Sequence, residues 1–124
     1  MDYEFHHVHL RCEDLDAAVD FYENVLNGKI TEHVALGGMP IVRMEVGGQR
    51  LFLSPKFGDI DVEPTSGKAR WGVYQLAFLV DDIDAAVEEL KARGAQAQNI
   101  KPSGNPIAFF TGPNNVQIEL MQRS

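Results

Sequence analysis

The sequence has few cysteines and few positive charges. Cys12 is the one cysteine among 124 residues, so no disulfide can form within the chain. Eleven Lys and Arg stand against eighteen Asp and Glu, which gives a formal net charge of -7. Because phosphate backbones and anionic lipids attract positive charge, this composition argues against nucleic acid or a membrane surface as a partner.

Long apolar runs are also missing. No stretch approaches the roughly 20 apolar residues that a membrane-spanning helix needs, and the first residues, Met1 to Phe5, lack the basic and apolar regions of a signal peptide. We therefore expect a cytoplasmic protein. Hydrophobic residues make up 44% of the chain and charged residues 23%, proportions that are typical of a globular domain of this length.

What the sequence does contain is an internal repeat. The segment Asp14–Val19, with the sequence DLDAAV, returns as DIDAAV at Asp82–Val87. Both copies are typical of helix starts, because an acidic residue caps the first free N–H groups and the apolar residues then recur at helical spacing. A strand-like stretch precedes each copy, and a glycine that can end a helix follows it, near Asn27-Gly28 and near Arg93-Gly94.

The later part of each half reads as short strands separated by turns. Hairpin turns are indicated at Gly47-Gly48 and at Pro113-Asn114-Asn115. The sequence thus predicts an α+β fold in which two paired βαβββ modules form a cupped mixed sheet with the helices on the outside. We expect a single domain over residues 1–124, with module one at about 5–54, a linker at about 55–71 and module two at about 72–122. Chance is the alternative explanation, but helix, turn and strand signals agree in both halves.

The repeat also relates polar positions to one another. Side chains alternate along a strand, so His7, His9 and Arg11 share the face opposite Val8 and Leu10. The offset between the two motifs carries His7 to Gln75, and it carries Leu51 to Glu119. A pseudo-twofold axis would gather these four positions, and three of them carry nitrogen or oxygen donors suited to a divalent ion with open coordination sites.

At this point the sequence resembles the vicinal oxygen chelate superfamily, which includes glyoxalase I, methylmalonyl-CoA epimerase, fosfomycin and bleomycin resistance proteins and extradiol dioxygenases. The resemblance spans nearly the whole chain. It rests on three segments, HVHL leading to Asp14-Leu15, YQLAF leading to Asp81-Asp82-Ile83, and QIEL at 117–120. These motifs indicate the fold but do not select one activity.

The resemblance implies a metal site at His7, Gln75 and Glu119, for a divalent ion such as Zn, Ni, Co, Mn or Fe. In glyoxalase and epimerase types a fourth ligand falls at the position assigned to Leu51, which cannot ligate, and Gln75 stands where three-ligand relatives usually have histidine.

By the same resemblance, Glu119 holds the metal and His9 or Tyr74 moves a proton. The implied function is a lyase, isomerase or group-transfer enzyme for a small oxygen-rich molecule. The alternative is a metal-free binding protein of the bleomycin-resistance type. Family members are often homodimers, so we expect one here.

The remaining predicted pocket residues have simpler alternatives. Arg11 and Arg43 suit a substrate carboxylate or phosphate, or else ion pairs with carboxylates such as Glu45 or Glu119. His7 and His9 also suit hydrogen bonds across the sheet, and Tyr74 suits plain packing. Apolar side chains are expected to complete the pocket wall: Leu51, Leu53 and Met121.

Overall fold

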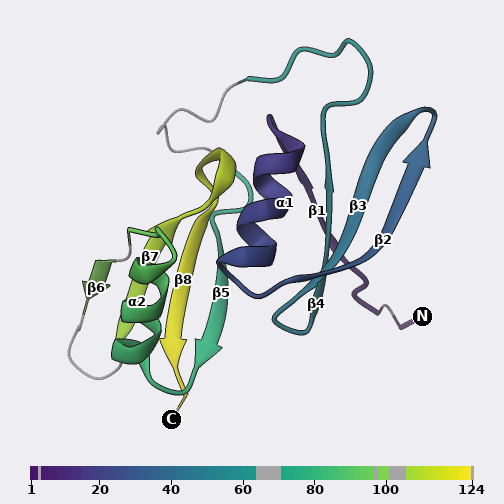
Figure 1. Cartoon of the computed structure of the whole chain (residues 1–124). Helices are drawn as coiled ribbons and strands as arrows, with labels where there is room; N and C mark the ends of the chain where they lie inside the picture. Colours follow the sequence, from purple (N-terminus) through teal and green to yellow (C-terminus); the bar gives the residue numbers. More distant parts are fainter. Residues whose placement is uncertain (3, 64–70, 97, 101–105, 124) are drawn as a thin grey trace. The chain divides into compact units, whose positions relative to one another are not determined.

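The computed structural model describes residues 1–2, 4–63, 71–96, 98–100 and 106–123 (Figure 1). The chain divides into two compact units, Met1–Glu63 and Pro64–Ser124. Of the predicted linker, residues 64–70 lie outside the described residues, and the described part, 55–63 and 71, contains no helix or strand. Among the described residues, no helix combines the length and apolar character needed to cross a bilayer.

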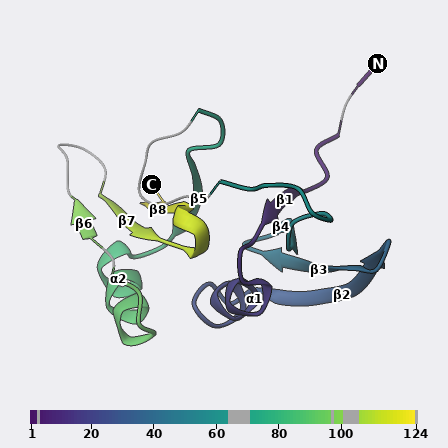
Figure 2. The same ribbon diagram turned by 90° about the horizontal axis from the view of Figure 1, so that it is seen from above.

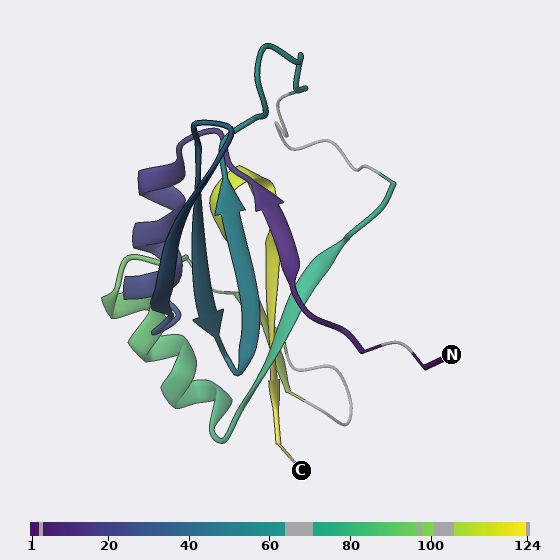
Figure 3. The same cartoon turned by 90° about the vertical axis from the view of Figure 1, so that its right-hand side faces the viewer.

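The first unit is a four-stranded mixed sheet with one helix. The strand order is β1-β4-β3-β2, with β1 parallel to β4 and the other neighbours antiparallel. Figure 3 shows the common direction of β1 and β4. The elements of this unit are β1 (Val8–Arg11), α1 (Leu15–Asn24), β2 (Lys29–Leu36), β3 (Met39–Val46) and β4 (Gln49–Ser54).

The second unit repeats this arrangement. Its strand order is β5-β8-β7-β6, again with the first and last strands of the unit parallel and adjacent. Figure 2 shows each helix lying on one face of the sheet of its own unit. The predicted α+β class with two βαβββ modules is therefore confirmed. The elements are β5 (Gln75–Val80), α2 (Ile83–Ala92), β6 (Gln98–Ile100), β7 (Ile107–Thr111), a short 3-10 turn (Pro113–Asn115) and β8 (Gln117–Gln122).

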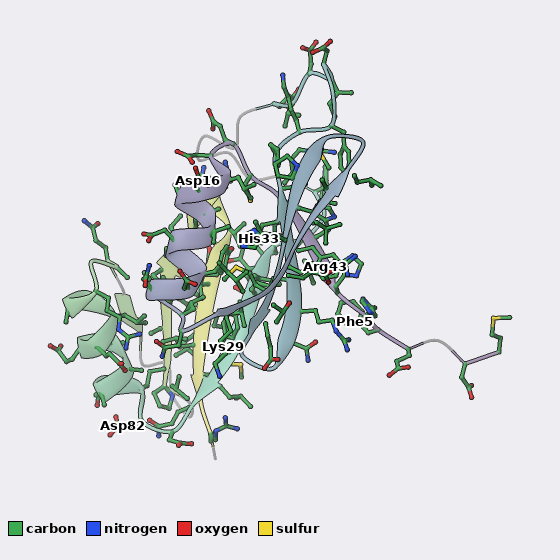
Figure 4. All side chains as sticks on the ribbon, turned by 45° about the vertical axis from the view of Figure 1, so that its right-hand side comes forward. Phe5, Asp16, Lys29, His33, Arg43 and Asp82 are labelled. Carbon is green, nitrogen blue, oxygen red and sulfur yellow. The ribbon has the colours of Figure 1, made fainter. Side chains whose placement is uncertain are left out.

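The repeated acidic motif caps both helices as predicted. Asp14 and Asp82 are extended, and each side chain accepts a hydrogen bond of 3.0 Å from the backbone N–H three residues later. Such a cap stabilises a helix by about 1 kcal/mol. Figure 4 shows Asp82 at the start of α2 and Asp16 in the first turn of α1. The caps are the firmest local evidence for the repeat.

The two helices end differently. Gly94 follows α2 with φ of 93°, the left-handed conformation that the sequence predicted. After α1 that conformation belongs to Asn27, with φ of 58°, and not to Gly28. Gly28 is instead a close-packed position, since a Cβ atom there would lie 2.7 Å from the carbonyl oxygen of Tyr22. The predicted role of Gly28 is thus corrected from a left-handed cap to a point of close approach.

Both predicted hairpin turns are confirmed. Gly47 and Gly48 have φ of 59° and 81°, and the turn joins β3 to β4. Asn114 and Asn115 have φ of 57° and 59° between β7 and β8. Glycine and asparagine tolerate positive φ better than other residues, which is why these positions carry a turn signal.

Tyr22 of α1 contributes a buried hydroxyl to the core of the first unit. The side chain is 1% exposed, and the hydroxyl has no hydrogen-bond partner among the described residues. Burial raises the pKa of this hydroxyl. A buried hydroxyl without a partner costs free energy that a hydrogen in its place does not.

Tyr22→Phe is therefore expected to leave the free energy of unfolding unchanged or to raise it by about 1 kcal/mol. Urea unfolding followed by circular dichroism measures the change. Tyr74→Phe, at a side chain that is 70% exposed, is the matched control and should have no effect. A clear loss of stability in Tyr22→Phe would mean that the hydroxyl has a partner after all.

Candidate metal and substrate site

One face of the first sheet gathers imidazole, guanidinium and aromatic groups around Phe52. Phe52 lies in the central strand β4 and is 8% exposed. The ladder places His9 of β1 and Arg43 of β3 on either side of it. We call His7, His9, Arg43 and Phe52 the Phe52 cluster. Since laterally paired residues of a sheet share a face, these side chains lie opposite α1.

The His7 ring is held by two neighbours. It stacks on Phe52 with 3.9 Å between ring centroids and an interplanar angle of 16°. Its Nδ1 lies 2.9 Å from Nδ1 of His6, so one of these two nitrogens donates a hydrogen bond to the other. Nε2 is therefore the nitrogen of His7 that remains for a ligand.

His9 is engaged through one ring nitrogen. Its Nε2 lies 2.7 Å from Oγ of Ser54, which is fully buried and whose hydroxyl is also placed to donate to the carbonyl oxygen of Pro55 at 3.1 Å. Burial, and then the nearby charges of His7 and Arg11, lower the pKa of His9. At neutral pH the ring is therefore in its uncharged form, able to accept a proton.

Arg43 makes the ion pair that the sequence left as one of two alternatives. Its Nη1 lies 3.1 Å from Oε2 of Glu32 on the neighbouring strand β2, and its Cζ lies 4.8 Å from the centroid of the Phe52 ring. Nε is buried without a partner among the described residues. Figure 4 shows the position of Arg43 on the first sheet. Arg11 is exposed and forms no ion pair within the described part of the chain.

In the second unit, Gln75 and Glu119 meet on the sheet face opposite α2. Nε2 of Gln75 donates a hydrogen bond of 3.0 Å to Oε2 of Glu119, and both residues are half-buried. Oε1 of Gln75 is buried and has no hydrogen-bond partner among the described residues. A buried carbonyl oxygen without a donor is unusual in a folded protein, and it is available to a cation.

The ladders correct the residue that corresponds to Glu119. His9 and Ala77 stand the same number of residues before the capping residues Asp14 and Asp82. In the ladders His9 pairs with Phe52, whereas Ala77 pairs with Glu119. Phe52, not Leu51, is therefore the equivalent of Glu119, and the sequence prediction was wrong by one residue.

Side-chain contacts support this correction. The equivalent pairs touch in both units, because His7 stacks on Phe52 and Gln75 donates a hydrogen bond to Glu119. A shift of one residue moves a side chain to the other face of a sheet. The fourth position of the predicted ligand set is therefore occupied by an aromatic ring, which cannot ligate an ion.

The predicted apolar lining is only partly on the expected face. Leu51 and Leu53 are 3% and 0% exposed and lie on the face of the sheet that packs against α1, so their assignment to the pocket wall is corrected. Met121 lies on the same face as Glu119 and is 37% exposed. Tyr74 precedes β5 and is 70% exposed, with no hydrogen bond among the described residues.

Sequence reasoning missed three members of the site's surroundings. These are Phe52, Ser54 and Glu32. Phe52 and Ser54 were reachable from the alternation of β4, since they share the face of the cluster if Leu51 and Leu53 face the helix. Glu32 was not, because the register between β2 and β3 shifts between Ile30 and Glu32.

The three predicted metal ligands are distributed over both units. His7 lies in the first unit, and Gln75 and Glu119 lie in the second. Within the part of the chain that the structure describes, no group of three or more His, Cys, Asp or Glu side chains gathers around one point. The predicted ligand set contains only two residues of these types, His7 and Glu119, and its third member is a glutamine. Convergence of the three residues on one ion therefore stays a prediction.

The chain is similar to several known proteins over most of its length. The uncharacterised protein YwkD of Bacillus subtilis is 27% identical over 130 residues, covering 95% of each chain. Human mitochondrial methylmalonyl-CoA epimerase is 29% identical over 112 residues, which cover 84% of this chain and 64% of the epimerase.

A solved structure shares the fold. It is the E126Q mutant of the fosfomycin resistance protein FosX from Listeria monocytogenes, complexed with Mn(II) and dihydroxypropylphosphonic acid. The TM-score is 0.73 at 19% identity, with 100% of this chain and 95% of that chain covered. The family model described as the glyoxalase/bleomycin resistance protein/dioxygenase superfamily matches residues 4–120. With its two βαβββ units and this match over almost its whole length, the chain belongs to that superfamily.

Proposed function

We propose that this protein is a glyoxalase-like metalloenzyme, a lyase, isomerase or group-transfer enzyme that acts on a small oxygen-rich molecule. The observation that carries the proposal is the unsatisfied side-chain carbonyl oxygen of Gln75. Its Oε1 is buried without a donor and lies in the same amide as the Nε2 that contacts the carboxylate of Glu119. His7 occupies the equivalent position in the first unit.

The donor set fits a divalent ion. We expect Nε2 of His7, Oε1 of Gln75 and a carboxylate oxygen of Glu119 to contact it at roughly 2.0 to 2.5 Å. The hydrogen bond between His6 and His7 and the stacking on Phe52 fix the His7 ring and direct Nε2 away from those contacts. A bound ion would supply a Lewis acid that stabilises negative charge on two neighbouring substrate oxygens.

Proton transfer falls to this chain's own side chains. His9 suits a general base, because its lowered pKa keeps the ring uncharged at neutral pH and its Nε2 is oriented by Ser54. Tyr74 suits a second proton carrier at the start of β5, since its hydroxyl makes no hydrogen bond among the described residues and faces solvent. Glu119 is assigned to the ion.

The relatives support this class of reaction without selecting one member. An epimerase is an isomerase by definition, and the FosX structure contains Mn(II) with a small phosphonic acid. The first supports an isomerase, and the second supports a divalent ion beside a small oxygen-rich ligand. We also infer that the protein acts as a homodimer, which light scattering coupled to gel filtration tests directly.

A metal-free binding protein is the second candidate, and one observation favours it. The amide of Gln75 already donates to Glu119, so the pair is stable without an ion. Phe52 also removes the fourth ligand and makes the position apolar. Such a protein would sequester its ligand without chemistry, as a bleomycin-resistance type does.

Calorimetric titration of the parent and of Gln75→His with Co(II), Ni(II) and Zn(II) tests the proposal. Imidazole binds these ions better than an amide oxygen, so the variant is expected to bind at least about tenfold more tightly. Gln49→His adds a histidine at an exposed position of β4 and controls for a non-specific gain. Added metal should also raise the melting temperature of Gln75→His more than that of the parent.

Two results would decide against the metalloenzyme. One is a gain in Gln49→His equal to that in Gln75→His. The other is a lack of metal binding by parent and variant, together with retained binding of a small organic ligand in metal-stripped protein. The second result would replace the enzyme with the binding protein.

A further inference from the structure

The guanidinium of Arg43 is only partly used by the protein. Nη1 is paired with Glu32, but this is the one nitrogen of the group with a partner among the described residues, and the side chain remains 40% exposed. Nε is buried without an acceptor. A buried donor that lacks an acceptor is unfavourable, so an acceptor brought by a ligand to this side of the guanidinium would be stabilised there.

The surrounding charges favour an anion. Arg11, Arg43 and Arg50 project from β1, β3 and β4 on the same side of the first sheet, by the alternation of the strands. Glu32 and Glu45 are the carboxylates on the adjacent positions of β2 and β3. The whole chain, these arginines included, has a formal net charge of -7, so a face with three arginines contrasts with its overall acidity.

The distances connect Arg43 to the predicted metal ligand of the same unit. The Arg43 guanidinium and the His7 imidazole contact one aromatic ring, that of Phe52, at 4.8 Å and 3.9 Å from its centroid. The predicted metal ligand and the guanidinium therefore belong to one set of contacts around Phe52.

We propose that Arg43 is an oxyanion-binding residue, which holds a carboxylate or phosphoryl group of the ligand through the edge of its guanidinium that Glu32 leaves open. The planar fork of arginine binds such groups through two parallel N–H bonds, which lysine cannot do. The substrate class is thus a small organic acid or phosphorylated molecule. The identity of this ligand as a substrate rests on the proposed function, but the binding itself does not.

The test uses the whole chain stripped of metal and desalted. Sodium benzoate and, separately, inorganic phosphate are titrated at constant ionic strength while the Nε–H signal of Arg43 and the backbone amides of β3 and β4 are followed by NMR. We expect saturable shifts with at least one probe. Benzoate alone indicates a carboxylate, phosphate alone a phosphoryl group, and both the shared oxyanion chemistry.

Three variants make the test specific. Arg43→Lys keeps the charge but loses the fork, and is expected to weaken binding at least about tenfold. Glu32→Gln removes the carboxylate that pairs with Nη1 and is expected to tighten binding of the probe anion. Arg123→Lys is the matched control, because Nε of Arg123 is ion-paired with Asp81 at 2.9 Å on the second unit. It should bind the probe as the parent does.

The absence of a saturable shift with both probes would overturn the proposal, as would unchanged affinity in Arg43→Lys. Either failure would leave the metal titrations of Gln75→His unaffected, since those measure a different set of donors. Conversely, oxyanion binding by a protein that never binds metal would keep Arg43 as a ligand residue of the binding-protein alternative.

Discussion

Glu119→Ala is expected to abolish divalent-metal binding, because Glu119 is the only charged donor in the predicted ligand set. A neutral imidazole and a neutral amide oxygen alone hold Co(II), Ni(II) or Zn(II) weakly, and the carboxylate supplies most of the electrostatic attraction. Calorimetric titration at fixed pH measures the loss. His7→Ala is expected to behave in the same way, since it removes the only nitrogen donor.

Glu119→Gln separates charge from structure. The amide oxygen of the new glutamine can accept the hydrogen bond that Nε2 of Gln75 now donates to Oε2, so the pair of side chains is preserved while the charge is lost. We expect affinity at least about tenfold below the parent with an unchanged melting temperature in the absence of metal.

His33→Ala controls for adventitious binding by surface histidines, since His33 is exposed on β2. Retention of metal binding by both Glu119→Ala and His7→Ala, or its loss in His33→Ala, would place the ion elsewhere on the chain.

The sequence predicted the framework of the site because the framework is locally encoded. Asp14 and Asp82 cap helices through contacts that span three residues, and alternation along β1 and the residue before it places His7, His9 and Arg11 on one face. Both features depend on near neighbours in the chain. For such local features, a residue's role in one half of the repeat correctly predicts the role of its equivalent in the other half.

The one-residue error at Leu51 shows where this transfer stops. The offset that relates Asp14 to Asp82 holds through the first strand and helix of each half, but the ladders show that it is one residue shorter at the last strand. Strand pairing is set by long-range contacts that the sequence offset does not record. Neighbouring residues of a strand face opposite sides of the sheet. The error of one residue therefore assigned the position to Leu51 in the core, whereas the residue on the face of His7 is Phe52.

The partners of charged side chains could not be predicted from the sequence either. Several carboxylates were possible partners of Arg43, and its pairing with Glu32 depends on the irregular register between β2 and β3. The unpaired atoms, Oε1 of Gln75 and Nε of Arg43, follow from the same long-range packing. These two atoms carry the functional proposals, so the most informative features of the site came from the structure.

Gly28→Ala is expected to destabilise the first unit by about 3 kcal/mol, near the upper end of the usual cost of overpacking a core. A Cβ atom at this position would lie 2.7 Å from the carbonyl oxygen of Tyr22 and 2.9 Å from Cγ2 of Val46. Movement of this carbonyl group away from the Cβ atom would cost free energy, because its oxygen accepts a hydrogen bond of 2.8 Å from the backbone N–H of Gly28 itself. Urea unfolding followed by circular dichroism measures the loss.

Val46→Ala in the same background tests the steric cause. Removing Cγ2 of Val46 relieves one of the two close contacts and leaves the other, so the double variant should lose less stability than the two single variants together. Residues in contact commonly show coupling energies of about 0.5 to 3 kcal/mol in such a cycle. Strict additivity would mean that the contact with Val46 does not cause the loss, and a Gly28→Ala variant as stable as the parent would mean that the chain after α1 moves aside at little cost.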